Sequence, residues 1–145
     1  MIKIRIAELS DAAALAVIFR DDLGEPDCTE EMVAQKLPLV DQKRECVFVA
    51  EDDAGQVCGV IHVELYDVLY FDRMINILGL AVKETHRRQG IAKQLLTAAE
   101  QWGKDHGALY MRINSGESRK GAHEFYRAQG CNSEKIQVRF LKELK

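Results

Sequence analysis

A nearly continuous apolar stretch that leads through a basic turn into a helix constrains this chain more than any other part of its sequence. Residues Met74–Val82 are almost all apolar, as expected for a central strand that is covered on both faces. After the turn, apolar side chains recur at helical spacing, at Ile91, Leu95, Leu96, Ala99 and Trp102. Gly107 favours the end of this helix. A strand joined in this way to a long amphipathic helix is typical of an α/β domain.

The rest of the chain continues the alternation of strands and helices. Further strands are expected at residues 3–7, 46–50, 57–63, 109–113 and 136–141. Further helices are expected from an N-cap at Ser10-Asp11 to about Arg20, from an N-cap at Thr29 to Leu37, and at residues 119–129. Because no repeat or linker interrupts this pattern, we expect residues 1–145 to form one domain.

Composition narrows the class of protein. Hydrophobic residues make up 47% of the chain and charged residues 30%, as in an ordinary soluble protein, and no stretch approaches the roughly 20 apolar residues of a membrane span. The start of the chain lacks a secretory h-region, so we expect a cytoplasmic protein without a membrane partner. A formal charge of −3 disfavours nucleic-acid binding. The four cysteines form no C-x-x-C pair, so we expect no metal.

The turn before the long helix has the chemistry of an anion site. A helix N-terminus presents unpaired amide N–H groups, and the small residues Gly90 and Ala92 let a phosphate approach them. Four basic residues surround the turn: Lys83, Arg87, Arg88 and Lys93. A polyanionic cofactor fits this local charge. A tight strand-to-helix connection with solvated basic side chains is the alternative interpretation.

Two blocks of sequence resemble the GNAT family of N-acetyltransferases. The segment Arg87-Arg88-Gln89-Gly90-Ile91-Ala92 is similar to the family motif R/Q-x-x-G-x-G/A, and Ala122–Cys131 is similar to A-x-x-F-Y-x-x-x-G-F. The resemblance implies an α/β fold with four helices and a mixed, mostly antiparallel sheet of six to seven strands. It also implies that the sheet splays at a bulge near Gly79-Leu80.

The resemblance implies that acetyl-CoA donates an acetyl group to an amine by direct attack in a ternary complex, without a metal. The backbone of Leu80, Ala81 and Val82 would bind the pantetheine arm, and an N–H near Leu80 would polarise the thioester carbonyl. The pyrophosphate would be held by residues of the turn and the start of the helix: Arg87, Arg88, Gln89, Gly90, Ile91, Ala92 and Lys93.

The second block implies a catalytic acid. Tyr126 occupies the position of the family tyrosine that protonates the departing thiolate, although it could instead pack with Phe125. Seven positions earlier, where many relatives have an asparagine, stands Arg119. Its two interpretations stay open: a contact to a cofactor phosphate, or a cap of the helix region.

The general base is not identified by the sequence. Asn114, where some relatives place a glutamate, cannot ionise. The carboxylates left open as candidates are Glu64, Asp67, Asp72 and Glu84. His62 lies on an apolar strand and is expected to belong to the core or a cleft wall rather than to act as a catalyst. His123 could orient a substrate, but a structural hydrogen bond is the simpler expectation.

The segments that bind acceptors in the family are acidic here: Asp21, Asp22, Glu25, Asp27, Glu30, Glu31, Glu64, Asp67 and Asp72. They favour a cationic amine such as a polyamine, an aminoglycoside-like sugar or a peptide, or else form a solvated face. A non-catalytic acyl-CoA-binding or regulatory module and a protein-interaction domain are the other functional classes. A homodimer through strand exchange near Ile136–Leu141 is also open.

Overall fold

A computed structural model describes all 145 residues, which form two compact units, Met1–Ile113 and Asn114–Lys145. The strands of the first unit are β1 (Lys3–Ile6), β2 (Glu45–Glu51), β3 (Val57–Tyr66), β4 (Met74–Val82) and β5 (Tyr110–Ile113). Its α-helices are α1 (Ala12–Asp21), α2 (Glu30–Lys36) and α3 (Ile91–Asp105). The second unit contains α4 (Lys120–Ala128).

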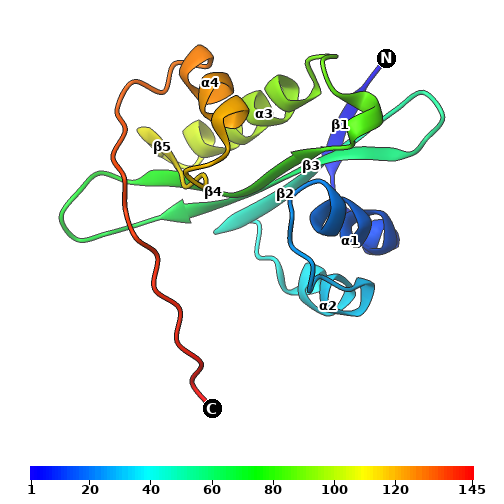
Figure 1. The fold of residues 1–145 in the computed structure, drawn as a ribbon, viewed down its shortest axis with the longest axis horizontal. Coiled ribbons are helices and arrows are strands. Elements are labelled where there is room, and N and C mark those ends of the chain that lie inside the picture. The colour runs from blue at the N-terminus through cyan, green and yellow to red at the C-terminus, as the bar shows by residue number, and fades with distance from the viewer. The chain divides into compact units, whose positions relative to one another are not determined.

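The first unit is built on one five-stranded sheet in the order β1-β2-β3-β4-β5. The first four strands are antiparallel neighbours, and β5 is parallel to β4. Helix α3 lies on one face of the sheet and α1 on the other, with α2 packed beside α1 (Figure 1). The strand at Met74–Val82 and the long helix after it are therefore confirmed, and β4 is buried between two helical layers.

The core follows the apolar periodicity of these elements. Leu15 and Ile18 of α1 are fully buried on one side of the sheet, and Leu95 and Leu96 of α3 on the other. Trp102 is also buried, which confirms that it packs in the core. Thr29 accepts a hydrogen bond from the Met32 amide at 3.1 Å, so the N-cap expected for α2 is confirmed.

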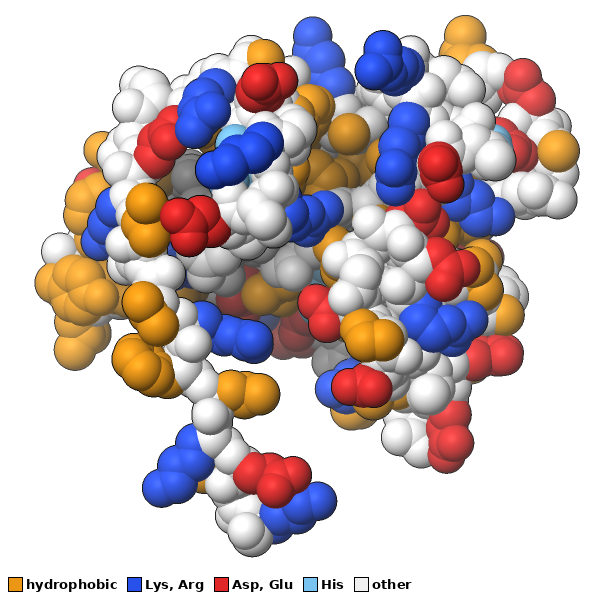
Figure 2. Space-filling view, in the orientation of Figure 1, with side chains coloured by type: hydrophobic (Ala, Val, Ile, Leu, Met, Phe, Trp, Pro, Cys, Tyr) orange, Lys and Arg blue, Asp and Glu red, His pale blue; other side chains and the backbone are white.

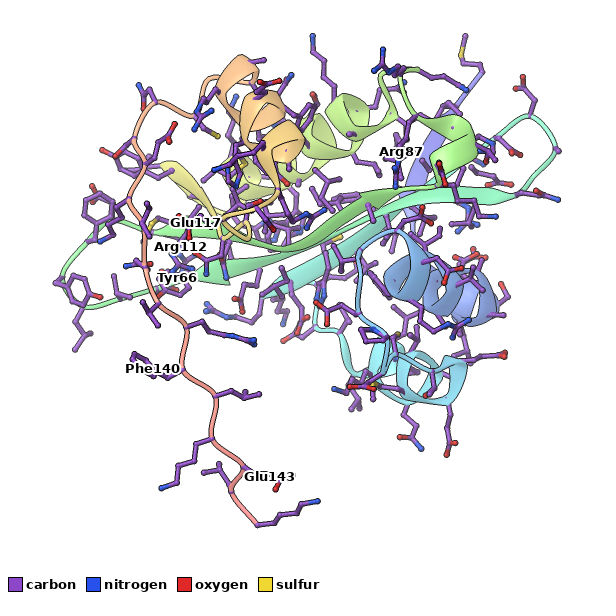
Figure 3. All side chains as sticks on the ribbon, viewed as in Figure 1. Tyr66, Arg87, Arg112, Glu117, Phe140 and Glu143 are labelled. Atoms are coloured by element: carbon purple, nitrogen blue, oxygen red, sulfur yellow. The ribbon has the colours of Figure 1, made fainter.

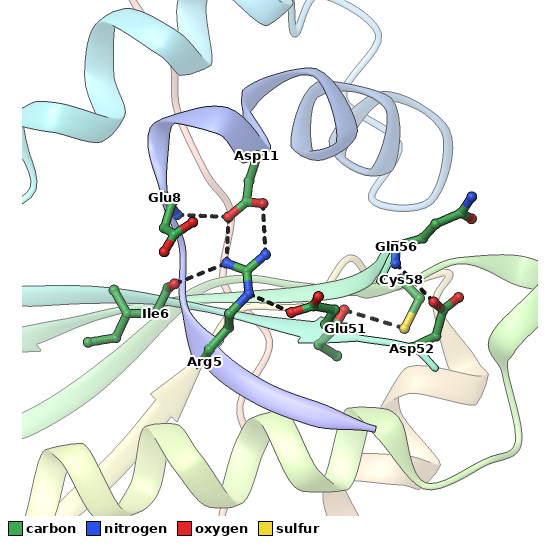
Figure 4. Close-up of polar contacts among 9 residues, drawn as sticks. Arg5, Ile6, Glu8, Asp11, Glu51, Asp52, Gln56 and Cys58 are labelled. Carbon is green, nitrogen blue, oxygen red and sulfur yellow. Dashed lines mark hydrogen bonds and ion pairs between the residues drawn. The ribbon is translucent and has the colours of Figure 1, made fainter. Parts of the chain in front are cut away.

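Asp11 corrects the cap expected for α1. Its side chain does not cap that helix but is almost completely buried and receives both guanidinium nitrogens of Arg5, at 2.8 and 2.9 Å. The same carboxylate accepts the Glu8 amide, and the Nε of Arg5 donates to Glu51 at 2.8 Å (Figure 4). The ion pair with Arg5 lowers the pKa of Asp11. This cluster joins β1, β2 and the start of α1.

A bulge interrupts β4 where the sequence predicts one. His62 of β3 pairs with Gly79, whereas the next residue, Val63, pairs with Ile77, so Leu78 is the extra residue. Strand β5 pairs with β4 only as far as Ile77. The β4 edge beyond the bulge has no strand beside it within this unit.

The second unit corrects the predicted strand at residues 136–141. After α4 the chain contains no helix or strand, so the sheet has five strands rather than six to seven. A strand exists only through hydrogen bonds to a neighbouring strand, and this segment makes none. Its hydrophobic side chains, such as Phe140, are exposed. Figure 2 shows hydrophobic side chains along this stretch of the chain. No helix anywhere in the chain is long and apolar enough to cross a membrane.

Candidate active site

The start of α3 is open. Gly90 is the N-cap residue with φ 76°, a left-handed conformation that glycine adopts without strain, and no side chain caps the helix. A Cβ built on Gly90 would meet no atom within 4 Å. The first amides of the helix, at Ile91, Ala92 and Lys93, have no hydrogen-bond partner in the chain. This turn can therefore receive an anion.

The basic side chains around the turn have different tasks. Arg87 is half-exposed, and its guanidinium donates to the Val82 carbonyl and to Asp22, both at 3.2 Å (Figure 3). It therefore fixes the path of the turn. Arg88 and Lys93 are exposed and make no ion pair, so their charges remain available to a ligand. Arg88 has φ 65°, so the turn places two residues in the left-handed region.

A second contact holds the turn from the hairpin side. His86, in the short 3-10 helix Glu84–His86, pairs its Nε2 with Asp52 at 3.0 Å. Asp52 also accepts the amides of Ala54 and Gln56 at the β2–β3 turn, which confirms the hairpin turn. Hydrogen bonds to these groups lower the pKa of Asp52, so it stays ionised. The hairpin and the anion site are thereby joined.

The β4 edge next to this turn carries the other predicted cofactor residues. Leu80, Ala81 and Val82 pair with β3 on one side, at Ile61, Val60 and Gly59. On their other side β5 has already ended, at Ile77 of β4. An extended ligand can therefore add to this edge as a strand would.

A row of polar side chains lies on the α1 face of β3, where every second residue is polar: His62, Glu64 and Tyr66. His62 Nε2 lies 2.7 Å from Glu45 of β2. Glu64 accepts from Asn76 at 2.9 Å, and Asn76 accepts from Arg112 at 3.0 Å. The Arg112 guanidinium stacks 4.7 Å from the Tyr66 ring centre (Figure 3).

This row was missed as a unit by sequence reasoning. Sequence reasoning names His62 and Glu64 in separate roles and does not name Glu45. The alternation of polar residues along residues 62–66, in a strand otherwise buried, was the available signal.

The four carboxylates considered as bases have different surroundings. Asp67 accepts two bonds from Arg73, at 2.9 and 3.1 Å, and one from Arg44, which lower its pKa and disfavour a role as a base. Glu64 is half-buried in the polar row, whereas Asp72 and Glu84 are exposed. Two of the predicted acceptor-binding acids, Asp22 and Asp67, are thus already paired with arginines.

The second unit carries Tyr126 and Arg119. Tyr126 is half-buried, which raises the pKa of its hydroxyl and keeps the phenol protonated at neutral pH. Its ring stacks edge-on with Phe125 at 5.4 Å. Arg119 is exposed at the N-cap position of α4, and its side chain does not cap the helix. His123 Nε2 lies 2.9 Å from the Gly116 carbonyl, the structural hydrogen bond expected for it.

Two buried thiols are poor nucleophiles. Cys46 and Cys58 are fully buried in β2 and β3. Burial raises the pKa of Cys46 to about 11 and also raises the pKa of Cys58. Neither thiol is therefore suited to carry an acyl group.

Comparison with known proteins identifies the family. Residues 12–131 match the acetyltransferase (GNAT) family. A probable N-acetyltransferase HLS1-like of Arabidopsis thaliana is 33% identical over an alignment of 124 residues, and the match covers 73% of this chain and 30% of that protein. The chain spans 27% and 30% of the lengths of the two HLS1-type relatives it matches.

Solved structures share the fold. The aminoglycoside 6'-N-acetyltransferase AAC(6')-Ih from Acinetobacter baumannii has a TM-score of 0.83 at 17% identity, over 100% of both chains. AAC(6')-Iy, solved in complex with CoA, has a TM-score of 0.83 at 18% identity, over 99% of this chain and 96% of that chain. The open turn at Gly90, the bulged β4 and the family match lead to one conclusion: this chain belongs to the GNAT acetyltransferase family.

Proposed function

We propose that this chain is an N-acetyltransferase that moves an acetyl group from acetyl-CoA to an amine. The observation that carries the proposal is the open start of α3 at Gly90, which directly follows a β4 edge without a neighbouring strand. The turn provides amides for a diphosphate, and the edge provides backbone groups for an amide-containing arm. Acetyl-CoA contains both parts in this order.

The binding residues divide according to the part of acetyl-CoA that they would contact. The amides of Ile91, Ala92 and Lys93 would receive the diphosphate, supported by the exposed charges of Arg88 and Lys93. The backbone of Leu80–Val82 would pair with the pantetheine arm. Gln89, exposed in the same turn, would border the path of the diphosphate.

The reaction needs three things: a neutral amine, a stabilised tetrahedral intermediate and a proton for the thiolate. A fixed N–H near Leu80 would stabilise the oxyanion. Tyr126 would donate the proton, since a phenol is protonated at neutral pH and can donate to a comparably basic thiolate. Arg119 lies near Tyr126 in the second unit, and its charge opposes the rise that burial causes in the pKa of the Tyr126 hydroxyl. Arg119 is proposed to contact the cofactor.

Direct attack of the amine on the thioester is favoured over an acyl-enzyme formed on either of the two fully buried cysteines. Cys46 and Cys58 are buried, and their raised pKa values leave almost no thiolate at neutral pH. We therefore propose a ternary complex of enzyme, acetyl-CoA and amine.

A cationic acceptor is proposed from the acids that remain unpaired between α1 and α2. Asp21, Glu25, Asp27 and Glu30 are exposed and make no ion pair. Several proteins with this fold are named as aminoglycoside acetyltransferases, and aminoglycosides are polyamines. The dimer through residues 136–141 also remains a proposal, supported by the uncovered hydrophobic side chains there.

Two measurements test this function. Calorimetric titration with acetyl-CoA should give saturable binding at one site per chain, and a thiol-release assay should then respond to a panel of amines that includes spermidine, neamine and lysine peptides. Binding without thiol release from any amine would favour the acyl-CoA-binding module. Absence of both would contradict the proposal and leave a protein-interaction domain.

A further inference from the structure

We propose that His62 is the general base that removes a proton from the attacking amine, and that Glu45 positions it. This inference rests on the proposed function, because it names the residue that prepares the acceptor. The sequence led us to expect a core or cleft-wall role for His62. The structure gives it a partner, a place beside the bulge and a face that it shares with other charged residues.

The hydrogen bond to Glu45 defines which nitrogen acts. His62 Nε2 lies 2.7 Å from the Glu45 carboxylate, which can only accept, so Nε2 carries the hydrogen. The other nitrogen, Nδ1, then holds the lone pair and has no protein partner. The two side chains are 30% and 33% exposed, enough for a substrate to reach them. A carboxylate that orients an imidazole is a common arrangement in general-base catalysis.

The position of His62 places this base at the β4 bulge. Gly79 is its cross-strand partner, and Leu78, the residue before Gly79, is the bulged one. Directly paired residues of a sheet project to the same face, so the imidazole lies on the face to which a side chain at position 79 would point. Leu23, which follows α1, lies over Gly79, where an added Cβ would approach it to 3.2 Å. The thioester is proposed to lie just beyond, at Leu80.

The charges on this face favour a cationic acceptor. Two carboxylates face His62, Glu45 from β2 and Glu64 from β3, while Arg112 of β5 is held away by its stacking on Tyr66 and its bond to Asn76. An ammonium group can bind next to these carboxylates before it gives up its proton. Glu64 is thus a binding residue rather than the base, since Asn76 already donates to it.

Each proton in the proposed step has a destination. The bound ammonium gives one proton to His62 Nδ1 and becomes a neutral amine. Its nitrogen forms a bond to the thioester carbonyl carbon, and the C–S bond breaks as the tetrahedral intermediate collapses. The thiolate takes a proton from Tyr126, which regains one from the amide nitrogen. His62 then releases its proton to water.

The test compares two amine probes of different basicity. Nα-acetyl-lysine amide carries an amine of pKa about 10.4, and glycinamide carries an α-amine of pKa about 8. His62→Gln should lower kcat/KM for the lysine probe at pH 7 by about 100-fold or more. The loss of kcat/KM for glycinamide should be at least about tenfold smaller, since a larger fraction of this amine is already neutral at pH 7. Raising the pH toward 10 should narrow the loss for the lysine probe.

Further variants separate positioning from folding. Glu45→Gln can still accept from Nε2, so it should retain more activity than Glu45→Ala, which leaves the imidazole without its partner. His106→Gln, at the far end of α3 from the turn, should leave kcat/KM unchanged. All variants should bind acetyl-CoA with the affinity of the wild type and unfold cooperatively.

The outcomes distinguish the two claims. Suppose that the wild type acetylates both probes. If His62→Gln has the same kcat/KM as the wild type, or if its kcat/KM falls by the same factor for both probes at every pH, His62 is not the base although the proposed function stands. If the wild type binds no acetyl-CoA, or binds it and releases no thiol with either probe, the acetyltransferase proposal fails and the role of His62 fails with it.

Discussion

At the scale of single residues, a substitution at Tyr126 should separate an effect on catalysis from an effect on acetyl-CoA binding. Its raised pKa keeps the proton on the phenol, and Tyr126→Phe removes that proton while keeping the ring that stacks on Phe125. We expect kcat to fall by about 100-fold with the acetyl-CoA affinity unchanged. Thiol release under saturating acetyl-CoA, together with calorimetric titration, measures both. Unchanged turnover, where chemistry limits the rate, would exclude Tyr126 as the acid.

A second residue, Asp11, makes a prediction about stability. Asp11→Asn removes the buried carboxylate from Arg5, which keeps its second partner Glu51, and should lower the free energy of unfolding by about 2 kcal/mol. Asp27→Ala, exposed and unpaired, should change it by less than about 0.5 kcal/mol. Urea denaturation measures both.

The difference in unfolding free energy between the wild type and Asp11→Asn should depend on pH, because the pKa of Asp11 is lowered in the folded chain. A carboxyl whose folded pKa is depressed stabilises the fold above its unfolded pKa of about 3.9. That contribution disappears as the pH falls through the folded pKa. The gap between wild type and Asp11→Asn should therefore be full at pH 7 and narrow below about pH 4. A gap that is constant with pH would contradict the ion-pair explanation.

At the scale of elements, helix α3 carries a glycine at each end that permits a matched comparison. Gly90 and Gly107 have φ 76° and 82°, and a Cβ at either would meet no atom within 4 Å. Alanine at either position should cost about 1 kcal/mol of stability through backbone strain. Only Gly90→Ala should also weaken acetyl-CoA binding, by about tenfold or more, because its methyl group crowds the open amides. Equal affinities in the two variants would place the diphosphate elsewhere.

The elements also show what the sequence could and could not predict. Strand β4 and helix α3 were predictable because burial makes β4 a nearly continuous apolar run and gives α3 apolar residues at helical spacing. Gly79 marked the bulge, although the extra residue is Leu78. The alternation at residues 136–141 suggested a strand, but alternation cannot supply the neighbour that a strand needs.

The candidate site was predictable where function resides in the backbone and less so where it depends on paired side chains. The turn at Gly90 has a local motif, so its residues could be named in advance. The bond between Glu45 and His62 joins positions 17 residues apart and depends on the register of β2 and β3. The bidentate pairing of Asp11 with Arg5 likewise required the paths of β1 and α1.

At the scale of the whole molecule, cofactor binding should raise the thermal stability of the folded chain. A ligand that binds only the folded chain stabilises it by about 2.7 kcal/mol at a concentration of 100 times its Kd. For a chain of 145 residues this corresponds to a rise of about 8–10 °C in Tm. The open amides of α3 and the charges of Arg88 and Lys93 are proposed to interact with the diphosphate. The stabilisation should therefore weaken as salt increases.

Acetyl-pantetheine separates the two halves of the proposed cofactor site, since it keeps the arm for the β4 edge but lacks the diphosphate. At equal concentration it should raise Tm by only a small part of the acetyl-CoA effect. Gly90→Ala should reduce the shift caused by acetyl-CoA and leave that of acetyl-pantetheine unchanged, since the methyl group lies at the helix start rather than at Leu80–Val82. Equal shifts from both ligands in the wild type would mean that the start of α3 does not bind the diphosphate.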